Sequence, residues 1–290
     1  MILIISHKGF HPGFKLFGLK DLIRLIDKNE WNNFSLFKKI GIAKKYKTIH
    51  YFWGRVNSWE ILLLLLLKKK IILHFIGSDV LMILNSKSKQ IKTKFYKTMG
   101  AKLFVVHKNL KQELNDVGIE TDVVEFVNRK IENINSSLTK DFSVLVYVPE
   151  GKENFYNLKM IKETAKEFPK TKFYIFPYNS EFEIENMIPV KPVAHEHVPE
   201  LIQQHNLFVR VPKHDGLPNT IIEALMCSRF VAWTFEHPFV YKVTTSKELM
   251  EVVKKTMNKN KLNSAGKDYV LENYNTEKLK NRFKELWEII

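Results

Sequence analysis

The chain is poor in the features that mark secreted and membrane-spanning proteins. Its 290 residues include a single cysteine, Cys227, so no internal disulfide can form, and a reducing compartment such as the cytoplasm is expected. The longest apolar run, residues 61–67, is closed by lysines, whereas a membrane-spanning helix needs about 20 apolar residues. The apolar start, residues 1–5, is too short for the core of a signal peptide, so we expect none.

Metal-binding motifs are missing as well. No Asp-x-Asp pair occurs that could hold a divalent ion against a diphosphate, and His195, Glu196 and His197 have no further ligands at a fixed spacing. We therefore expect no metal and no other cofactor. Helix-turn-helix, zinc and RNA-binding motifs are not recognisable, which argues against nucleic acid as the partner.

Negative charge is scarce in one half of the chain only. The formal net charge is +15; residues 1–140 carry +14 of it and residues 141–290 carry +1. This asymmetry favours a domain boundary near the middle and an anionic partner for the first half: nucleic acid, acidic lipid or a phosphate-bearing acceptor. Biased codon usage would explain many lysines, but not their confinement to one half.

Short apolar runs alternate with longer amphipathic segments, which is the pattern of an α/β protein. In the first half we predict strands at 2–6, 48–52, 71–76, 102–107 and 122–127, with helices at 14–25, 58–67 and 109–117. In the second half we predict strands at 143–148, 172–176, 207–211 and 230–233, with helices at 158–168, 198–205 and 220–227, followed by two C-terminal helices. The polar, turn-rich residues 129–140 between these halves read as a linker.

The most informative segment runs from Asp215 to Glu223. Its two carboxylates stand eight positions apart, the first in a Gly/Pro turn and the second about one turn into an apolar helix. The free N–H groups at a helix N-terminus favour anions, so this junction suits a ligand with phosphates at one end and sugar hydroxyls at the other. A surface helix capped by Asp215 remains an equally good interpretation of the residues alone.

A family resemblance favours the first interpretation. The segment His214-Asp215-Gly216-Leu217-Pro218-Asn219-x-x-x-Glu223-Ala224-Leu225-x-Cys227-Ser228-Arg229-x-Val231 resembles the E-x7-E segment of retaining, nucleotide-sugar-dependent glycosyltransferases of the GT-B fold, family 4 above all. Residues 72–79 and 101–118 are similar to the strand-to-loop segment before the cleft and to the last βα unit of the first domain. There are two departures: Asp215 replaces the usual glutamate, and Ser228 stands where glycine is common.

The resemblance implies two Rossmann-like domains facing a central cleft. The acceptor-binding domain would be 1–128 and the nucleotide-sugar-binding domain 141–275, with the helix at 276–290 crossing back to the first domain. Glu223 would hold the ribose hydroxyls and Asp215 the sugar hydroxyls. The residues expected around the donor are Gly216, Leu217, Pro218, Asn219, Lys152, Lys213, Gly9 and Gly13, and the residues expected to be catalytic are Asp215, His74 and Arg210.

Several of these candidates have a structural alternative. His74, at a strand end, is expected to face the cleft, but it could equally be a hydrogen-bonded structural histidine. Arg210 could stabilise the diphosphate or pair with a carboxylate of the second domain, and Lys152 could be an ordinary solvated loop lysine. Gly9 and Gly13 lie in the loop after the first strand, and any βα loop could carry two glycines.

The function implied is metal-independent transfer of a sugar, with retention of configuration, from a UDP- or GDP-sugar to a glycan or lipid-linked acceptor. An inverting GT-B enzyme, with a carboxylate or histidine base near residues 9–13 or 74–79, is the alternative within this class. A nucleic-acid-binding or non-catalytic binding protein that uses the basic first half is the alternative of another class.

An apolar stripe in the first half predicts contact with a membrane. Trp31, Phe34, Phe37 and Ile40 recur at helical spacing among Lys38, Lys39, Lys44, Lys45 and Lys47, and a second basic run follows at Lys87, Lys89, Lys92, Lys94 and Lys97. An in-plane amphipathic helix at the anionic inner face of a membrane has this pattern. Aromatic residues in the core with a solvated rim of lysines would have it too.

Overall fold

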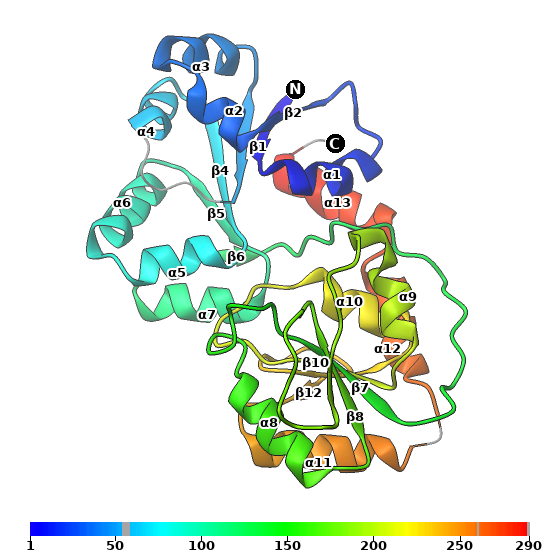
Figure 1. Cartoon of the computed structure of the whole chain (residues 1–290). Helices are drawn as coiled ribbons and strands as arrows, with labels where there is room; N and C mark the ends of the chain where they lie inside the picture. Colours follow the sequence, from blue (N-terminus) through cyan, green and yellow to red (C-terminus); the bar gives the residue numbers. More distant parts are fainter. Residues whose placement is uncertain (54–58, 260, 289–290) are drawn as a thin grey trace. The chain divides into compact units, whose positions relative to one another are not determined.

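The computed structural model describes residues 1–53, 59–259 and 261–288, and the chain divides into two compact units (Figure 1). The first unit comprises Met1–Lys130, Asp215–Leu217 and Thr276–Ile290. The second comprises Ile131–His214 and Pro218–Asn275. Each unit has a parallel sheet with helices, the doubly wound α/β arrangement that the alternating pattern predicts.

The first unit is built on a six-stranded parallel sheet in the order β2-β1-β3-β4-β5-β6. Its strands are β1 (Ile2–Ser6), β2 (Ile23–Asp27), β3 (Thr48–Phe52), β4 (Lys70–Phe75), β5 (Lys102–Val105) and β6 (Asp122–Val123). Its helices are η1 (Lys8–Phe10), α1 (His11–Leu16), α2 (Lys28–Asn33), α3 (Leu36–Ala43), α4 (Trp59–Leu66), α5 (Ser78–Leu84), α6 (Lys87–Thr98), α7 (Lys108–Asp116) and α13 (Thr276–Trp287).

Two predicted helices of the first unit are wrong. The helix predicted at 14–25 is a short helix, α1, followed by strand β2, because Gly18 at φ 66° leaves the helical region and residues 23–27 pair with β1. The stripe from Trp31 to Ile40 is not one helix but two. Ser35 begins α3 by accepting a hydrogen bond from the Lys38 backbone, and Trp31, on α2, is fully buried.

Strand β3 shows how the two faces of this sheet are covered. Successive side chains of a strand point to opposite faces. Tyr51 contacts α4 through its hydroxyl, which donates to Glu60 over 3.2 Å, and Trp31 of α2 donates to the same carboxylate over 2.8 Å. His50 lies on the other face and accepts a hydrogen bond from Trp287 of α13 over 3.1 Å. Helix α13, the last element of the chain, therefore completes the core of the first unit.

The second unit repeats the plan with a sheet in the order β12-β11-β10-β7-β8-β9. Its strands are β7 (Ser143–Tyr147), β8 (Lys172–Phe176), β9 (Met187–Pro189), β10 (Leu207–Arg210), β11 (Phe230–Trp233) and β12 (Tyr241–Lys242). Its helices are α8 (Leu158–Glu167), η2 (His195–His197), α9 (Val198–Gln203), α10 (Asn219–Met226), α11 (Ser246–Met257) and α12 (Ser264–Asn273). Residues 124–142, all of them described, form no helix or strand, in keeping with a linker.

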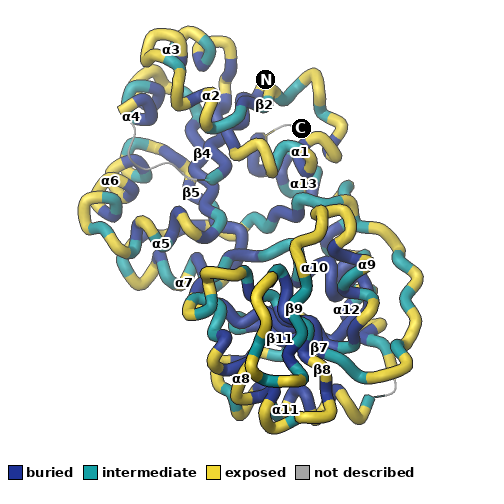
Figure 2. Tube along the Cα trace, viewed as in Figure 1, coloured by how far each residue is buried: buried dark blue, intermediate teal, exposed yellow. Residues whose placement is uncertain are grey.

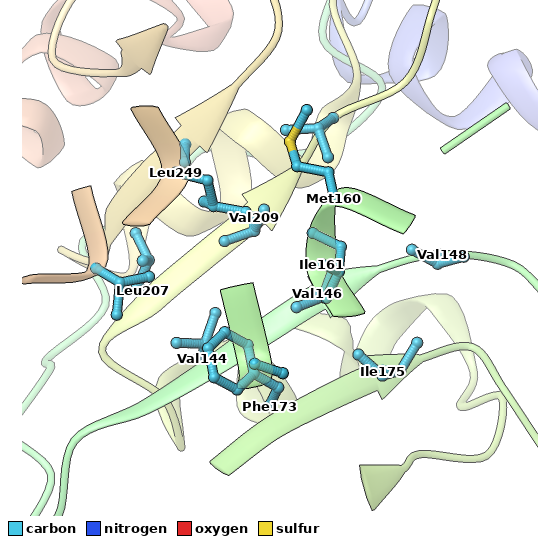
Figure 3. Close-up of a cluster of buried hydrophobic side chains, with 14 of the residues drawn as sticks. Val144, Val146, Val148, Met160, Ile161, Phe173, Ile175, Leu207, Val209 and Leu249 are labelled. Atoms are coloured by element: carbon cyan, nitrogen blue, oxygen red, sulfur yellow. The ribbon is translucent and has the colours of Figure 1, made fainter. Parts of the chain in front are cut away.

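The core of the second unit follows from the runs of β-branched residues in its strands. Val144 and Val146 of β7 pack with Val209 of β10, and Ile161 of α8 and Leu249 of α11 cover this face of the sheet (Figure 3). Strands buried on both faces read as continuous apolar runs, which is why these strands were predictable. In each unit the buried residues follow the sheet and the exposed ones follow the outer sides of the helices (Figure 2).

Candidate functional site

In the second sheet, β7 and β10 are the neighbouring strands from which the chain winds in opposite directions. Ligands of open α/β sheets bind beyond the carboxyl ends of the strands at such a switch point. Tyr147 ends β7 and Arg210 ends β10. The Arg210 guanidinium carbon lies 4.3 Å from the centroid of the Tyr147 ring and 5.3 Å from that of Tyr156. A buried cation thus lies beside two neighbouring aromatic rings at this point of the sheet.

The loop after β7 is fixed by Glu153. Its carboxylate accepts hydrogen bonds from the Gly151 N–H over 2.8 Å and from the Tyr178 hydroxyl over 3.0 Å. Backbone N–H groups hold the pKa of Glu153 below its usual range, and burial followed by this carboxylate raises the pKa of Tyr178 to about 12. Lys152, one of the predicted donor-binding residues, is an exposed residue of this loop.

Lys213 is tied to the same loop. Its backbone N–H donates to the Phe155 carbonyl and its ammonium donates to the Asn154 side chain, both over 2.8 Å. Arg210, Lys213 and Lys152 therefore all lie in or beside the segments that leave β7 and β10. The arrangement gathers positive charge at this edge of the sheet, and contact of these residues with a donor diphosphate stays a prediction.

Glu223 lies in the second turn of α10, which begins after Pro218 in an extended conformation. The residue is only 1% exposed, and His195 Nε2 lies 3.7 Å from its Oε1 atom. His195 belongs to η2, 28 positions earlier in the chain, and is itself exposed. The sequence pattern around His195 indicates at most a metal ligand, and no local signal reports its pair with Glu223.

The segment Asp215–Leu217 belongs to the first unit, so the two carboxylates of the motif fall in different units. Asn109 donates from its side chain to the Asp215 carbonyl over 2.7 Å. A Cβ atom on Gly216 would lie 2.2 Å from the Ile76 carbonyl oxygen, which no side chain tolerates. Glycine at 216 is therefore required by close packing of backbone on backbone. Leu217 is buried, and Pro218 and Asn219 form the start of α10.

His74 does not face a cleft as its position at a strand end predicted. Its ring is fully buried, stacked at 5.4 Å on His50, and its Nε2 lies 2.8 Å from the Val124 carbonyl oxygen. The alternation of β4 places it on the sheet face that α13 covers, since it lies 5.9 Å from the Phe283 ring. Burial lowers the pKa of His74 to about 3, so the ring is neutral. A catalytic role for His74 stays a prediction, which this position does not favour.

Gly9 and Gly13 follow β1, but they lie in η1 and α1 and not in a loop, and Gly13 has a packing role. A Cβ on Gly13 would lie 2.6 Å from the Phe126 ring, and its N–H donates to the Asn128 side chain over 2.8 Å. Asn128 donates in turn to the Gly9 carbonyl. These contacts join η1 and α1 to the end of the first unit's main segment, and contact of either glycine with a donor stays a prediction.

His11 begins α1 and is the histidine in the range 9–13, where a base for an inverting reaction was expected. Burial lowers its pKa, and the Asp27 carboxylate opposes that shift. Its Nε2 atom is buried and, within the described residues, has no hydrogen-bond partner; the same holds for Ser6 Oγ, at the carboxyl end of β1. β1 and β3 form the switch point of the first sheet, so these groups mark the corresponding edge of this unit. No cluster of three or more metal-ligating side chains occurs in the described parts of either unit.

Comparison with known proteins gives fold neighbours only. No protein-family model and no curated protein matches the chain in sequence. Among solved structures, HepE of Anabaena in complex with UDP and glucose is 10% identical, with a TM-score of 0.70 over 100% of this chain and 99% of that one. Sucrose-phosphate synthase of Thermosynechococcus elongatus is 10% identical, with a TM-score of 0.69 over 99% and 98%.

A third neighbour carries another activity in its name. The UDP-N-acetylglucosamine 2-epimerase of Listeria monocytogenes, described as putative, is 9% identical, with a TM-score of 0.58 over 100% of this chain and 97% of that one. Together with the two parallel six-stranded sheets, these likenesses establish a GT-B fold. At this level of identity they do not establish a family or a reaction. No helix of the described residues is long and apolar enough to cross a membrane.

Proposed function

We propose that this protein is a glycosyltransferase that uses a nucleotide sugar, with the donor bound by the second unit. The observation that carries the proposal is the junction of β10 with α10. It places a buried guanidinium, Arg210, at the end of the strand and a buried carboxylate, Glu223, in the helix that follows. Cation and carboxylate match the two ends of a sugar nucleotide, a diphosphate and a ribose. The GT-B fold and HepE, which was solved with UDP and glucose, support the same class of ligand.

The chemistry asked of the protein is largely electrostatic. The bond between the sugar's anomeric carbon and the diphosphate oxygen breaks, and the anomeric carbon bonds to an acceptor hydroxyl, whose proton passes to the departing diphosphate. Negative charge develops on the departing β-phosphate. Arg210, Lys213, Lys152 and the N–H groups at the start of α10 would stabilise that charge without a metal ion. Asp215 would hold hydroxyls of the transferring sugar.

The stereochemical course is proposed as retention, which rests on the resemblance of the Asp215–Glu223 segment to retaining enzymes. Inversion requires a base near the acceptor, and His11 is the observation that favours it. Its neutral ring has a buried Nε2 atom that, among the described residues, bonds to nothing. Proton NMR of the first product formed decides between the two, because the anomeric coupling constant differs between retained and inverted products.

The acceptor is proposed to bind the first unit and to be a glycan or a lipid-linked sugar. The excess charge of this half suits a phosphate-bearing acceptor, and a location at the anionic inner face of a membrane fits the same charge. Among the described residues no helix spans a membrane, so association with a membrane would be peripheral.

Calorimetry with UDP and GDP tests the donor assignment. A carboxylate bonded to ribose hydroxyls makes charge-assisted contacts of about 1.5–3 kcal/mol, so Glu223→Gln is expected to weaken nucleotide binding by roughly 10- to 150-fold. Glu200→Gln is the matched control. Like Glu223, Glu200 lies close to a histidine, with 3.4 Å between its carboxylate and His197, but both residues of this second pair are exposed. Equal affinity in wild type and Glu223→Gln would refute the assignment.

Product analysis separates transfer from the other activity found on this fold. Incubation with UDP-N-acetylglucosamine and no acceptor is expected to leave the sugar nucleotide unchanged or slowly hydrolysed. Conversion to its 2-epimer would replace the transferase proposal with an epimerase.

A further inference from the structure

Helix α6 presents apolar side chains to solvent and packs on its unit through polar ones. Gln90, Thr93 and Tyr96 are its buried residues, and Gln90 is satisfied by donating to the Leu84 carbonyl over 3.0 Å. At 100° per residue, Ile91 and Phe95 lie opposite this buried side, and they are 67% and 46% exposed. This orientation reverses that of an ordinary surface helix, whose apolar stripe faces the core.

Lysines border this apolar ridge on both sides. On the helical wheel, Lys87 and Lys94 fall on one flank of Ile91 and Phe95, and Lys92 falls on the other. All three lysines are exposed, and α6 contains no acidic residue. A stripe of apolar side chains edged by cations is the arrangement of helices that lie in the interface of an anionic bilayer.

Opposing charge is scarce around α6, where Lys97 pairs with the exposed Glu120 over 2.7 Å. Residues 31–112 contain 17 Lys and Arg but only two carboxylates, Glu60 and Asp79. Both are buried: Glu60 pairs with Lys39 over 3.0 Å, and Asp79 accepts hydrogen bonds from the backbone at Ile76. The described surface of this stretch therefore carries positive formal charge alone.

Helix α3 adds a second apolar tip on the same face of the first sheet. Phe37 is 88% exposed, beside the exposed Lys38. Burial and then the Glu60 carboxylate raise the pKa of Tyr96 on α6. Glu60 belongs to α4, the helix that packs against α3. α3, α4 and α6 follow one side of the first unit (Figure 1), and their outer sides are largely exposed (Figure 2).

We propose that the ridge formed by Ile91 and Phe95, with Phe37 of α3, docks this protein on an anionic lipid bilayer. The apolar tips enter the boundary between headgroups and acyl chains, and the lysines contact lipid phosphates. A nucleic acid could contact the lysines and stack bases on the phenylalanine rings, but the aliphatic Ile91, the more exposed residue of the ridge on α6, offers its bases no stacking face. The docking proposal is argued from these residues and does not depend on the proposed enzymatic function. The consequence that the acceptor is lipid-linked rests on the proposed glycosyltransferase function.

Flotation of the full chain with vesicles tests the docking. Binding is expected to vesicles of phosphatidylcholine with about a third phosphatidylglycerol, but not to phosphatidylcholine alone, and to fall steeply with salt as screening shortens to about 8 Å at physiological ionic strength. Lys87→Gln combined with Lys94→Gln should weaken binding about 25-fold, at roughly fivefold per lysine. Lys162→Gln combined with Lys166→Gln, exposed lysines of α8, is the matched control and should change nothing.

The apolar contribution is tested at constant charge. Ile91→Ser combined with Phe95→Ser should weaken vesicle binding at least tenfold, whereas Leu138→Ser combined with Met257→Ser, exposed apolar residues of the second unit, should not. Circular dichroism and UDP calorimetry of the same variants check folding and donor binding, so that failure of docking is separate from failure of the proposed function.

Two outcomes overturn the proposal. One is no flotation of the wild type even at low salt. The other is binding that survives in Ile91→Ser/Phe95→Ser. A third result would assign the surface to nucleic acid instead. In that case the wild type would not float with vesicles but would bind an oligonucleotide tightly, and only the lysine substitutions would abolish that binding.

Discussion

At the residue scale, Arg210 is the side chain on which the proposed chemistry depends most. It is buried at the end of β10 beside the rings of Tyr147 and Tyr156, with its Nη2 donating to the Tyr156 hydroxyl over 3.5 Å. These contacts restrain the guanidinium, whose N–H donors all lie in its plane. A planar, oriented cation suits two phosphate oxygens better than a flexible ammonium does.

Replacement of Arg210 is therefore expected to slow turnover severely. Arg210→Gln removes charge that opposes the departing diphosphate, and loss of one such group costs about 2.7–4 kcal/mol, or 100- to 1000-fold in kcat. Arg210→Lys keeps the charge but loses the planar fork, and should recover only part of the rate. UDP release from a nucleotide sugar measures both variants. An exposed arginine of β2, Arg24, provides the control, and equal rates in Arg24→Gln and Arg210→Gln would contradict the role of Arg210.

Some of these residues were predictable from sequence and others were not, for physical reasons. Arg210 and Glu223 lie in a strand and a helix that local patterns define, and the turn predicted at Ser228 has the positive φ, 54°, that glycine would adopt. The pair between His195 and Glu223 joins residues far apart in the chain, and no local pattern reports it. The period of a strand places His74 on one of two faces, but which face α13 covers depends on tertiary packing.

At the scale of elements, the strands of both sheets were largely predictable because buried parallel strands are continuous apolar runs. β2 was missed since its burial is partial, with Arg24 exposed, and its residues continue the helical spacing of α1. The break between α2 and α3 was missed because the apolar spacing runs through it, whereas Ser35, a helix-starting residue, was the local signal of the break.

Strands β3 and β4 and helix α13 meet at two buried histidines, which make stability depend on pH. Burial lowers the pKa of His50 well below 6.5 and that of His74 to about 3. Below about pH 6.5 the unfolded chain takes up protons that the folded chain does not. The stabilisation is therefore complete above pH 6.5 and is lost progressively as the pH falls toward 3.

Urea unfolding at pH 7 and pH 5 measures this loss. Between these values each such histidine is expected to cost about 2 kcal/mol of unfolding free energy, so the protein should weaken markedly while most carboxylates remain ionised. His74→Phe should remove about one histidine's share of the difference, and His197→Gln, at an exposed position, should leave it unchanged. A pH dependence that is the same in all three proteins would contradict this account.

At the scale of the whole molecule, charge and fold divide at about the same place in the chain. The half with +14 supplies most of the first unit, and the nearly neutral half supplies most of the second. The donor chemistry proposed for the second unit needs only a few fixed cations, whereas the lysines of the first unit are spread over helices α3, α6 and α7 and the segments between elements. Positive charge spread over many lysines, as in the first unit, suits an extended anionic surface. A few fixed cations, as in the second unit, suit a single diphosphate.

The absence of an Asp-x-Asp pair leads to a prediction about the whole reaction. A diphosphate leaving group must be stabilised either by a divalent ion or by protein cations, and this chain offers Arg210, Lys213 and Lys152. Donor turnover is therefore expected to be unchanged in EDTA and not to rise with added magnesium or manganese. A metal-dependent glycosyltransferase assayed in parallel confirms that the chelator is effective. Complete loss of turnover in EDTA, restored by manganese, would mean that a metal ion and not Arg210 carries the charge of the leaving group.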